Sequence, residues 1–173
     1  MRTYFFLDTD LQGNAEYDIS GNNYADLIDI CCKYSSVLSL MIENKRVKLV
    51  KQLESFRIAQ PKNIQNEYTR YSQNDDGAGL DIRYYRVCDE LCNLLKSSAN
   101  SIFDWVYGQG HNKPEDPIFY REDGSKFFSS VIHEGECTLC IAEGENADIV
   151  ICNGNWVEES HSCYCKIHVH YIH

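Results

Sequence analysis

The hydrophobic pattern changes its period near Ile118, and this change constrains the fold more than any single motif does. Before that point, short apolar runs alternate with stripes at helical spacing, as in residues 22–34 and 43–56. After it, apolar runs are separated by Asp123-Gly124 and Glu134-Gly135, two pairs that favour β-hairpin turns. This order predicts an α+β domain, in which about three helices pack on one face of a mainly antiparallel sheet.

The same pattern places the individual elements. The first third predicts strand, helix, strand and helix over residues 3–7, 22–34, 35–42 and 43–56. A loop is expected over 60–79, a strand over 80–87, one long helix over 89–107 and a further strand over 147–156. Together they predict a single compact domain over residues 1–157, followed by a Cys- and His-rich tail over 158–173.

Charge and composition exclude several classes of partner. The net charge of -10 argues against nucleic acid, because phosphate binding needs a basic surface, but it would attract a basic protein. No apolar run approaches the roughly 20 residues of a membrane helix, and the N-terminus does not read as a signal peptide. We therefore expect a cytoplasmic protein with no membrane partner.

Nine cysteines are many for such a chain. In a cytoplasmic protein disulfides are not the default, so Cys31, Cys32, Cys88 and Cys92 are interpreted as packing residues on two helices. Cys137 and Cys140 have the spacing of half a zinc site, but in a strand they would point to opposite faces.

The tail offers an alternative zinc site. Its candidate ligands are Cys163, Cys165, His168 and His170, which lack the turn geometry of a zinc knuckle. We expect no cofactor, with zinc bound by these four residues as the alternative.

One acidic stretch near the N-terminus has two functional interpretations, a phosphatase motif and a calcium loop, and both are incomplete. Asp8-Thr9-Asp10 resembles the first motif of haloacid-dehalogenase-type phosphatases, although the downstream acidic pair lacks a strand before it. As a calcium loop, the same stretch has Ile19 where a bidentate Glu should stand. A strand end followed by a turn explains these aspartates more simply.

His133, Glu134 and Glu136 could form an acid-base set with Cys137 as nucleophile. Gly135 with charged neighbours is also what a hairpin turn requires, and we favour that interpretation. Because no catalytic constellation is complete, we expect a protein that is not an enzyme. The rival hypothesis is a hydrolase, or a small-ligand or nucleotide-binding protein, that uses Asp8, Asp10, His133 and Glu134.

Aromatic and arginine residues gather in two segments, RYYR at 83–86 and IFYR at 118–121. Residues of this kind often anchor protein interfaces. The residues expected to contact a partner are Tyr85, Trp105, Phe119, Tyr120 and Arg121.

Three stretches resemble a known family: YFFLDTDLQGNAEYDI at the start, IFDWVYGQG, and EDPIFYREDGSKFFSSVIHEGECTL. The chain is similar over residues 1 to about 156 to small proteins of Gram-positive bacteria and their phages, which often carry the label "stage III sporulation protein AH". The resemblance implies a small cytosolic protein of a bacterium or its mobile elements, acting in the host cytoplasm if phage-encoded. By analogy it implies an inhibitor, of the toxin-immunity or anti-defence type, that binds and occludes another protein.

Overall fold

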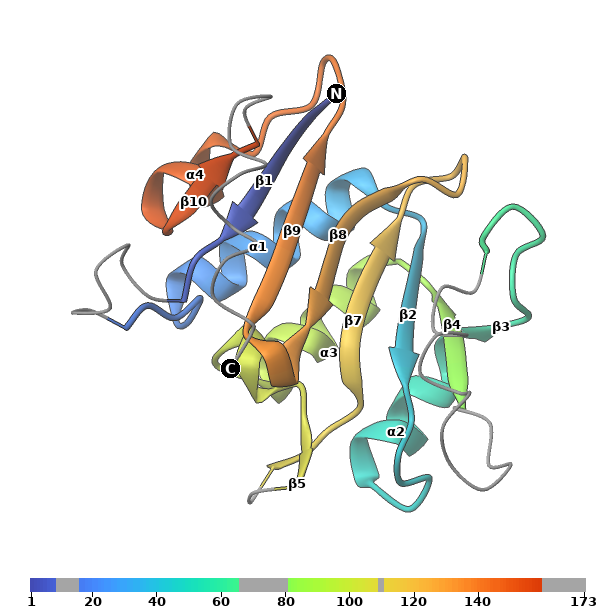
Figure 1. Ribbon diagram of the computed structural model, residues 1–173. Coiled ribbons are helices and arrows are strands. Elements are labelled where there is room, and N and C mark those ends of the chain that lie inside the picture. Colours follow the sequence, from blue (N-terminus) through green and yellow to red (C-terminus); the bar gives the residue numbers. More distant parts are fainter. Residues whose placement is uncertain (9–15, 66–80, 109–110, 160–173) are drawn as a thin grey trace, which may run out of the picture.

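The computed structural model describes residues 1–8, 16–65, 81–108 and 111–159. Within them, eight strands form one antiparallel sheet in the order β10-β1-β9-β8-β7-β2-β4-β3 (Figure 1). The strands are β1 (Arg2–Phe6), β2 (Val37–Met41), β3 (Arg57–Ile58), β4 (Ile82–Arg86), β7 (Glu115–Tyr120), β8 (Lys126–Val131), β9 (Glu136–Ile141) and β10 (Trp156–Glu158). A separate two-stranded ribbon joins β5 (Tyr107–Gly108) to β6 (His111–Asn112).

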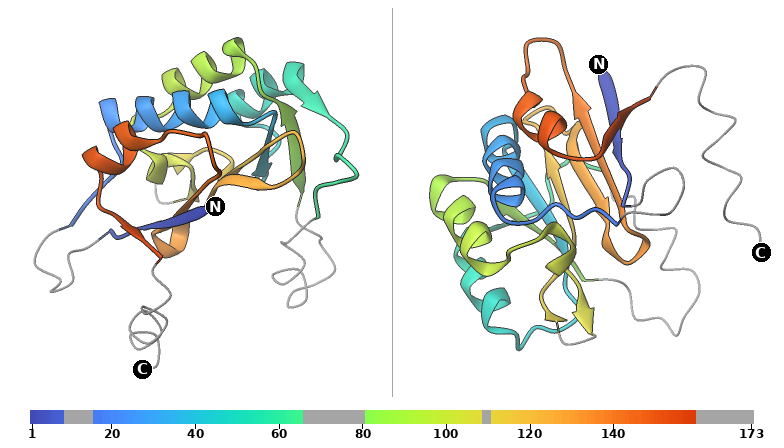
Figure 2. Two further views of the ribbon diagram at one scale, coloured as in Figure 1. Left: turned by 90° about the horizontal axis from the view of Figure 1, so that it is seen from above. Right: turned by 90° about the vertical axis from the view of Figure 1, so that its left-hand side faces the viewer.

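The helices lie on one face of this sheet (Figure 2). They are α1 (Asn22–Tyr34), α2 (Lys48–Leu53), α3 (Asp89–Ser98) and α4 (Asp148–Asn153), with short 3-10 turns η1 (Glu54–Phe56), η3 (Ile102–Asp104) and η4 (Ile132–Glu134). Leu27 and Ile28 of α1 and Leu91 of α3 are buried in the same core as Leu38 of β2 and Phe119 of β7. The predicted α+β class, with helices on one face of an antiparallel sheet, is confirmed.

The opposite face carries a second, smaller hydrophobic cluster. Because side chains alternate along a strand, the neighbours of the core residues Leu38 and Phe119 point the other way. The cluster contains Val37, Ile64, Tyr84, Ile118 and Tyr120, all buried. Strands β2, β4 and β7 are therefore buried on both faces.

The two predicted hairpins are present. In the β7–β8 turn, Gly124 has φ of 86° and the Asp123 carboxylate accepts from the Ser125 backbone N–H at 2.8 Å. In the β8–β9 turn, Gly135 has φ of 71°, a conformation that glycine adopts without the strain of a Cβ.

The single helix expected over residues 89–107 is wrong: α3 ends at Ser98, and η3 follows after a break. Ser101 caps η3 by accepting from the Phe103 N–H at 3.0 Å, and Asp104 accepts from the backbone N–H of Ser101 in a capping box. These side chains offer the backbone an alternative to continued helix, which ends the element although the apolar spacing goes on.

The strand expected over residues 147–156 is also wrong in part. Its first half forms α4, where the Asn146 side chain accepts from the Asp148 N–H at 2.8 Å, and only Trp156–Glu158 forms a strand, β10. A short apolar run has no decisive period, and the turn formed by the Asn146 side chain directs the chain into α4. The domain extends slightly past the expected boundary at 157, because Glu159 N–H still donates to the Thr3 carbonyl at 2.8 Å.

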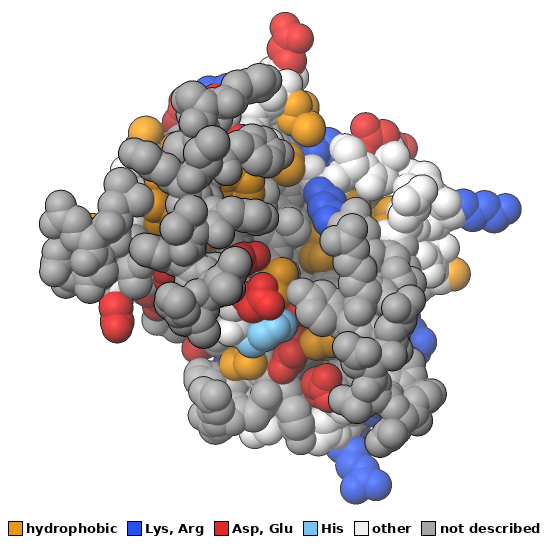
Figure 3. Space-filling view, viewed as in Figure 1, with side chains coloured by type: hydrophobic (Ala, Val, Ile, Leu, Met, Phe, Trp, Pro, Cys, Tyr) orange, Lys and Arg blue, Asp and Glu red, His pale blue; other side chains and the backbone are white. Residues whose placement is uncertain are grey.

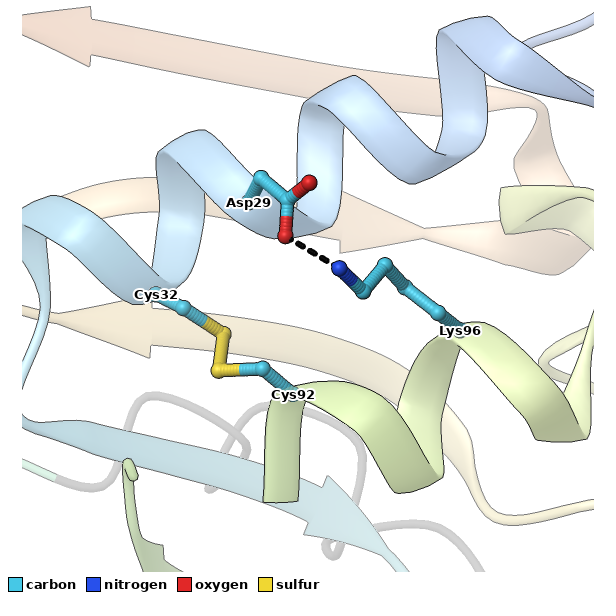
Figure 4. The surroundings of a disulfide bond; sticks show 4 residues. All are labelled: Asp29, Cys32, Cys92 and Lys96. Carbon is cyan, nitrogen blue, oxygen red and sulfur yellow. Dashed lines mark hydrogen bonds and ion pairs between the residues drawn. A yellow bond between two sulfur atoms is a disulfide. The ribbon is translucent and has the colours of Figure 1, made fainter. Parts of the chain in front are cut away.

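A disulfide joins Cys32 of α1 to Cys92 of α3, beside an ion pair of 2.5 Å between Lys96 Nζ and Asp29 Oδ1 (Figure 4). The interpretation of these two cysteines as unbonded packing residues is therefore wrong. Cys31 is buried in the core as expected, and Cys88 is a half-buried free thiol.

Within the described part of the chain, none of the helices has the length and apolar character needed to cross a bilayer.

Candidate functional site at the acidic end of the sheet

The site is built around η4, the turn that follows β8. The Asp116 carboxylate on β7 accepts a hydrogen bond of 2.8 Å from the backbone N–H of Ile132, which is the first residue of that turn. Asp116 is buried and has φ of 50°, a left-handed conformation that Asp tolerates better than most residues. It therefore fixes η4 from a neighbouring strand, and the turn presents His133 and Glu134 to solvent.

Asp8, just beyond β1, lies against the same turn. A Cβ placed at Gly135 would lie 2.7 Å from Asp8 Oδ2, so the carboxylate packs directly on the glycine backbone. The Asp8 backbone carbonyl accepts from the Tyr17 N–H at 2.6 Å, which holds the chain that leaves the strand. The fold thus joins one residue of the opening Asp-Thr-Asp motif to the turn that carries His133 and Glu134. Asp10, the other residue of that motif, lies outside the described residues.

We call the carboxylates Asp8, Asp116, Glu134 and Glu136 the acidic end. Burial raises the pKa of Asp116, even though the hydrogen bond from Ile132 and the nearby His133 act in the opposite direction. Burial also raises the pKa of Glu136, and the neighbouring Glu134 raises it further. These shifts show that the charged forms are disfavoured by partial loss of water and by their like-charged neighbours.

Few cations balance this charge. Among the described residues, Asp8, Glu134 and Glu136 form no ion pair with a lysine or arginine, and His133 Nε2 lies 3.7 Å from Glu134 Oε1. Figure 3 shows acidic side chains gathered around a histidine on the face turned away from the helices. The arrangement would attract a positively charged group.

The chemistry that these residues can perform is limited. Cys137, one candidate nucleophile, is buried in the core, and burial together with Asp116 raises the pKa of its thiol well above the usual range. A thiol in this state is a poor nucleophile, since the thiolate is the reactive form.

A metal site is not formed by the described residues. They contain no group of three or more His, Cys, Asp or Glu side chains placed to hold a metal ion. Strand β9 places Cys137 in the core and half-buried Cys140 on the other face, as the alternation predicted. The alternative zinc ligands Cys163, Cys165, His168 and His170 lie outside the described residues.

Four of the five residues expected to contact a partner are buried in the interior, which corrects that prediction for them, and the fifth, Arg121, is half-buried. Tyr85 and Phe119 are fully buried, and Trp105 and Tyr120 are 1% and 3% exposed. The first three belong to the helix-facing core and Tyr120 to the second cluster. The sheet is covered on both faces here, so alternation along a strand leaves neither set of aromatic side chains at the surface.

Two of these residues hold polar networks inside the domain. The Trp105 indole N–H donates to the Tyr24 hydroxyl at 3.0 Å, and this hydroxyl donates to the Leu95 carbonyl at 3.0 Å. Arg121 donates two hydrogen bonds of 2.6 Å to the Glu145 carboxylate and others to the carbonyls of Lys126 and Cys140. Its side chain is 12% exposed, so Arg121 supports the β7–β8 turn and offers little surface to a partner.

Asp116 is the site residue that sequence reasoning missed. The available signal was the Asp-Pro pair at 116–117, which is typical of a turn leading into a strand. Its contact with Ile132, 16 residues later, follows from the β7–β8 pairing.

No protein-family model, no curated protein and no solved structure matches this chain.

Proposed function

We propose that this protein is a non-enzymatic binding protein that occludes a basic protein partner through its acidic end. The observation that carries the proposal is the group of exposed carboxylates Asp8, Glu134 and Glu136 on and around η4, which form no ion pair with a lysine or arginine among the described residues. A lysine or arginine of a partner would supply the missing counter-charge. The net charge of -10 would add long-range attraction and speed the encounter.

The architecture supports this role. Asp116 and the Asp8–Gly135 contact fix the turn before binding, so little conformational freedom is lost when a partner docks. The resemblance to small proteins of Gram-positive bacteria and their phages supports an inhibitor of the immunity or anti-defence type, by analogy. A cytoplasmic setting in the bacterium belongs to the same proposal.

The test is a quantitative capture from a Gram-positive lysate with two triple variants. One variant, Asp8→Asn with Glu134→Gln and Glu136→Gln, neutralises exposed charges at the acidic end. The matched control neutralises three exposed carboxylates elsewhere, at Glu43, Glu122 and Glu143. We expect one stoichiometric partner that is retained by the wild type and the control and lost by the first variant. Equal retention by both variants would contradict the proposal.

A second candidate function is favoured by one observation: Asp8 meets the turn that carries His133 and Glu134. These three residues were the core of the rival small-ligand or hydrolase hypothesis. A thermal-shift screen with nucleotides and divalent metals tests it, because a ligand at 100 times its Kd stabilises by about 2.7 kcal/mol. A shift abolished by Asp8→Asn but not by Glu122→Gln would favour this candidate.

A further inference from the structure

A shallow cavity, open to solvent and with three cations in its lining, lies beside α2 and the loop that follows β2. Its volume is about 620 Å³, and its walls come from the loop before α2, from α2, from the end of α3, and from Asn112 of β6 with the following Lys113. The polar residues of the lining that matter here are Asn44, Arg46, Lys48, Gln52, Asn112 and Lys113. Among the described residues, the lining contains no aspartate or glutamate, although the chain as a whole has ten more acidic than basic residues.

The cations of the cavity are little compensated. Among the described residues, Arg46 and Lys48 have no ion-pair partner, and Lys113 Nζ lies 4.0 Å from Asp104 Oδ2, the limit of an ion pair. The adjacent Lys45, by contrast, is bound to Asp81 at 3.1 Å and does not line the cavity. Three positively charged residues therefore line the cavity, and only Lys113 has a carboxylate within ion-pair distance among the described residues.

The loop that carries Arg46 is set by its own hydrogen bonds. The Asn44 side chain accepts from the Arg46 backbone N–H at 2.9 Å, and the Val47 N–H donates to the Asn44 carbonyl at 3.3 Å. Val47 and Leu49 add an apolar wall beside the charged groups. A fixed loop with cations, amides and one apolar wall is the composition of a small-ligand site.

We propose that this cavity binds a small molecule that carries a diphosphate or other clustered phosphate charge. Three cations around one volume call for a ligand with at least two negative charges, and phosphate oxygens accept from lysine and arginine alike. The cavity is shallow and open to solvent, so recognition would rest on its three cations and not on enclosure of the ligand. A long nucleic acid is disfavoured, because its phosphates beyond the cavity would lie close to the surface of a protein with a net charge of -10 and would be repelled by it.

This inference goes beyond the proposed function and uses none of its residues. Calorimetric titration of the full chain with inorganic pyrophosphate is the direct test, and ATP is the second probe. Similar affinities for the two probes would show that the phosphates alone are recognised, and tighter binding of ATP would show that the nucleoside also contacts the cavity. Either result supports the proposal.

The variants compare two lysines of the same helix. Lys48→Gln removes a lining cation, whereas Lys51→Gln removes an exposed cation of α2 outside the lining. We expect Lys48→Gln to weaken pyrophosphate binding about tenfold or more, and Lys51→Gln to weaken it less than about twofold. Both side chains are exposed, so urea unfolding should show that both variants fold like the wild type.

Three results would overturn the proposal. The first is the absence of saturable binding of pyrophosphate and ATP at millimolar concentrations. The second is equal weakening by Lys48→Gln and Lys51→Gln, which would indicate non-directional attraction. The third is equal affinity for sulfate and pyrophosphate, or binding of a single-stranded oligonucleotide alone. Because Asp8, Glu134 and Glu136 are unchanged in these variants, the outcome is independent of the capture experiment.

Discussion

The disulfide between Cys32 and Cys92 makes a strong prediction about stability. It closes a loop of sequence separation 60, and restricting the unfolded chain over that length stabilises the folded state by about 4 kcal/mol. A domain of this kind unfolds with a total free energy of about 5–15 kcal/mol, so reduction should remove a large part of it. The ion pair of Lys96 and Asp29 also joins α1 to α3. It is partly exposed and contributes at most about 1 kcal/mol.

The assay is urea unfolding of the oxidised protein, the dithiothreitol-treated protein and the Cys32→Ser variant. With an m-value of about 2 kcal/mol per M, we expect reduction to lower the unfolding midpoint by about 2 M. Cys32→Ser should match the reduced wild type, because the half-buried position allows the serine hydroxyl to be hydrated. It should not respond to dithiothreitol, because it has no disulfide to reduce. Cys152→Ser, at an exposed free cysteine, is the matched control and should keep the full response.

Two results would refute this reasoning. If reduction changes the free energy of unfolding by less than about 0.5 kcal/mol, the bond does not restrict the unfolded chain as the loop-entropy argument requires. If peptide mapping without reductant finds Cys32 and Cys92 as free thiols, the bond itself is absent.

Further predictions concern three residues of the interior, Tyr24, Asp116 and Arg121. Tyr24→Phe leaves the Trp105 N–H without its acceptor and should lower the free energy of unfolding in urea by about 2–4 kcal/mol. Tyr17→Phe, at an exposed tyrosine, should leave it unchanged, and equal effects of the two variants would contradict the buried network. Asp116→Ala removes the acceptor of the Ile132 N–H and should cost about 1–3 kcal/mol. The folded pKa of Asp116 is raised, so its stabilising contribution is complete below the unfolded pKa near 3.8 and is lost as pH rises through the folded pKa. Asp116→Asn should therefore gain stability relative to wild type from pH 4 to pH 7 in urea unfolding. A difference in unfolding free energy between the two proteins that stays constant with pH would contradict this sign. Arg121→Lys breaks the two hydrogen bonds of the guanidinium to Glu145 and should lower the free energy of unfolding in urea by about 3 kcal/mol. A decrease below about 0.5 kcal/mol, as for an exposed ion pair, would show that this network does not stabilise the fold.

Local chemistry explains which parts of the fold the sequence could predict. The turns at Gly124 and Gly135 were predictable because a glycine, which tolerates positive φ, next to polar residues is a signal within a few positions. The end of α3 was not predicted, because the apolar spacing continues past Ser98 and the decisive capping box lies in residues that also occur within helices.

Burial was harder to predict than secondary structure. Alternation in IFYR indicates two faces but does not reveal that both faces are covered, so Phe119 and Tyr120 were mistaken for surface anchors. The role of Arg121 depends on Glu145, which lies 24 positions later and shares no motif with it. Long-range pairs of this kind carry no local sequence signal.

The candidate site was partly accessible for the same reason. His133, Glu134 and Glu136 are neighbours along the chain and were recognised together. The position of Asp8 beside Gly135 depends on the antiparallel pairing of β1 with β9, and the link from Asp116 to Ile132 depends on the path of β7. The pairing of Cys32 with Cys92 likewise cannot be deduced from spacing alone.

The most direct test of the proposed binding role is a kinetic measurement on the partner obtained by capture. Its association rate is compared for the wild type, the variant neutralised at Asp8, Glu134 and Glu136, and the control neutralised at three other exposed carboxylates. We predict that the first variant associates about tenfold or more slowly and depends less on salt, while the control stays within about twofold of wild type. Equal association rates and equal salt dependence for the two variants would contradict a role for the acidic end in binding.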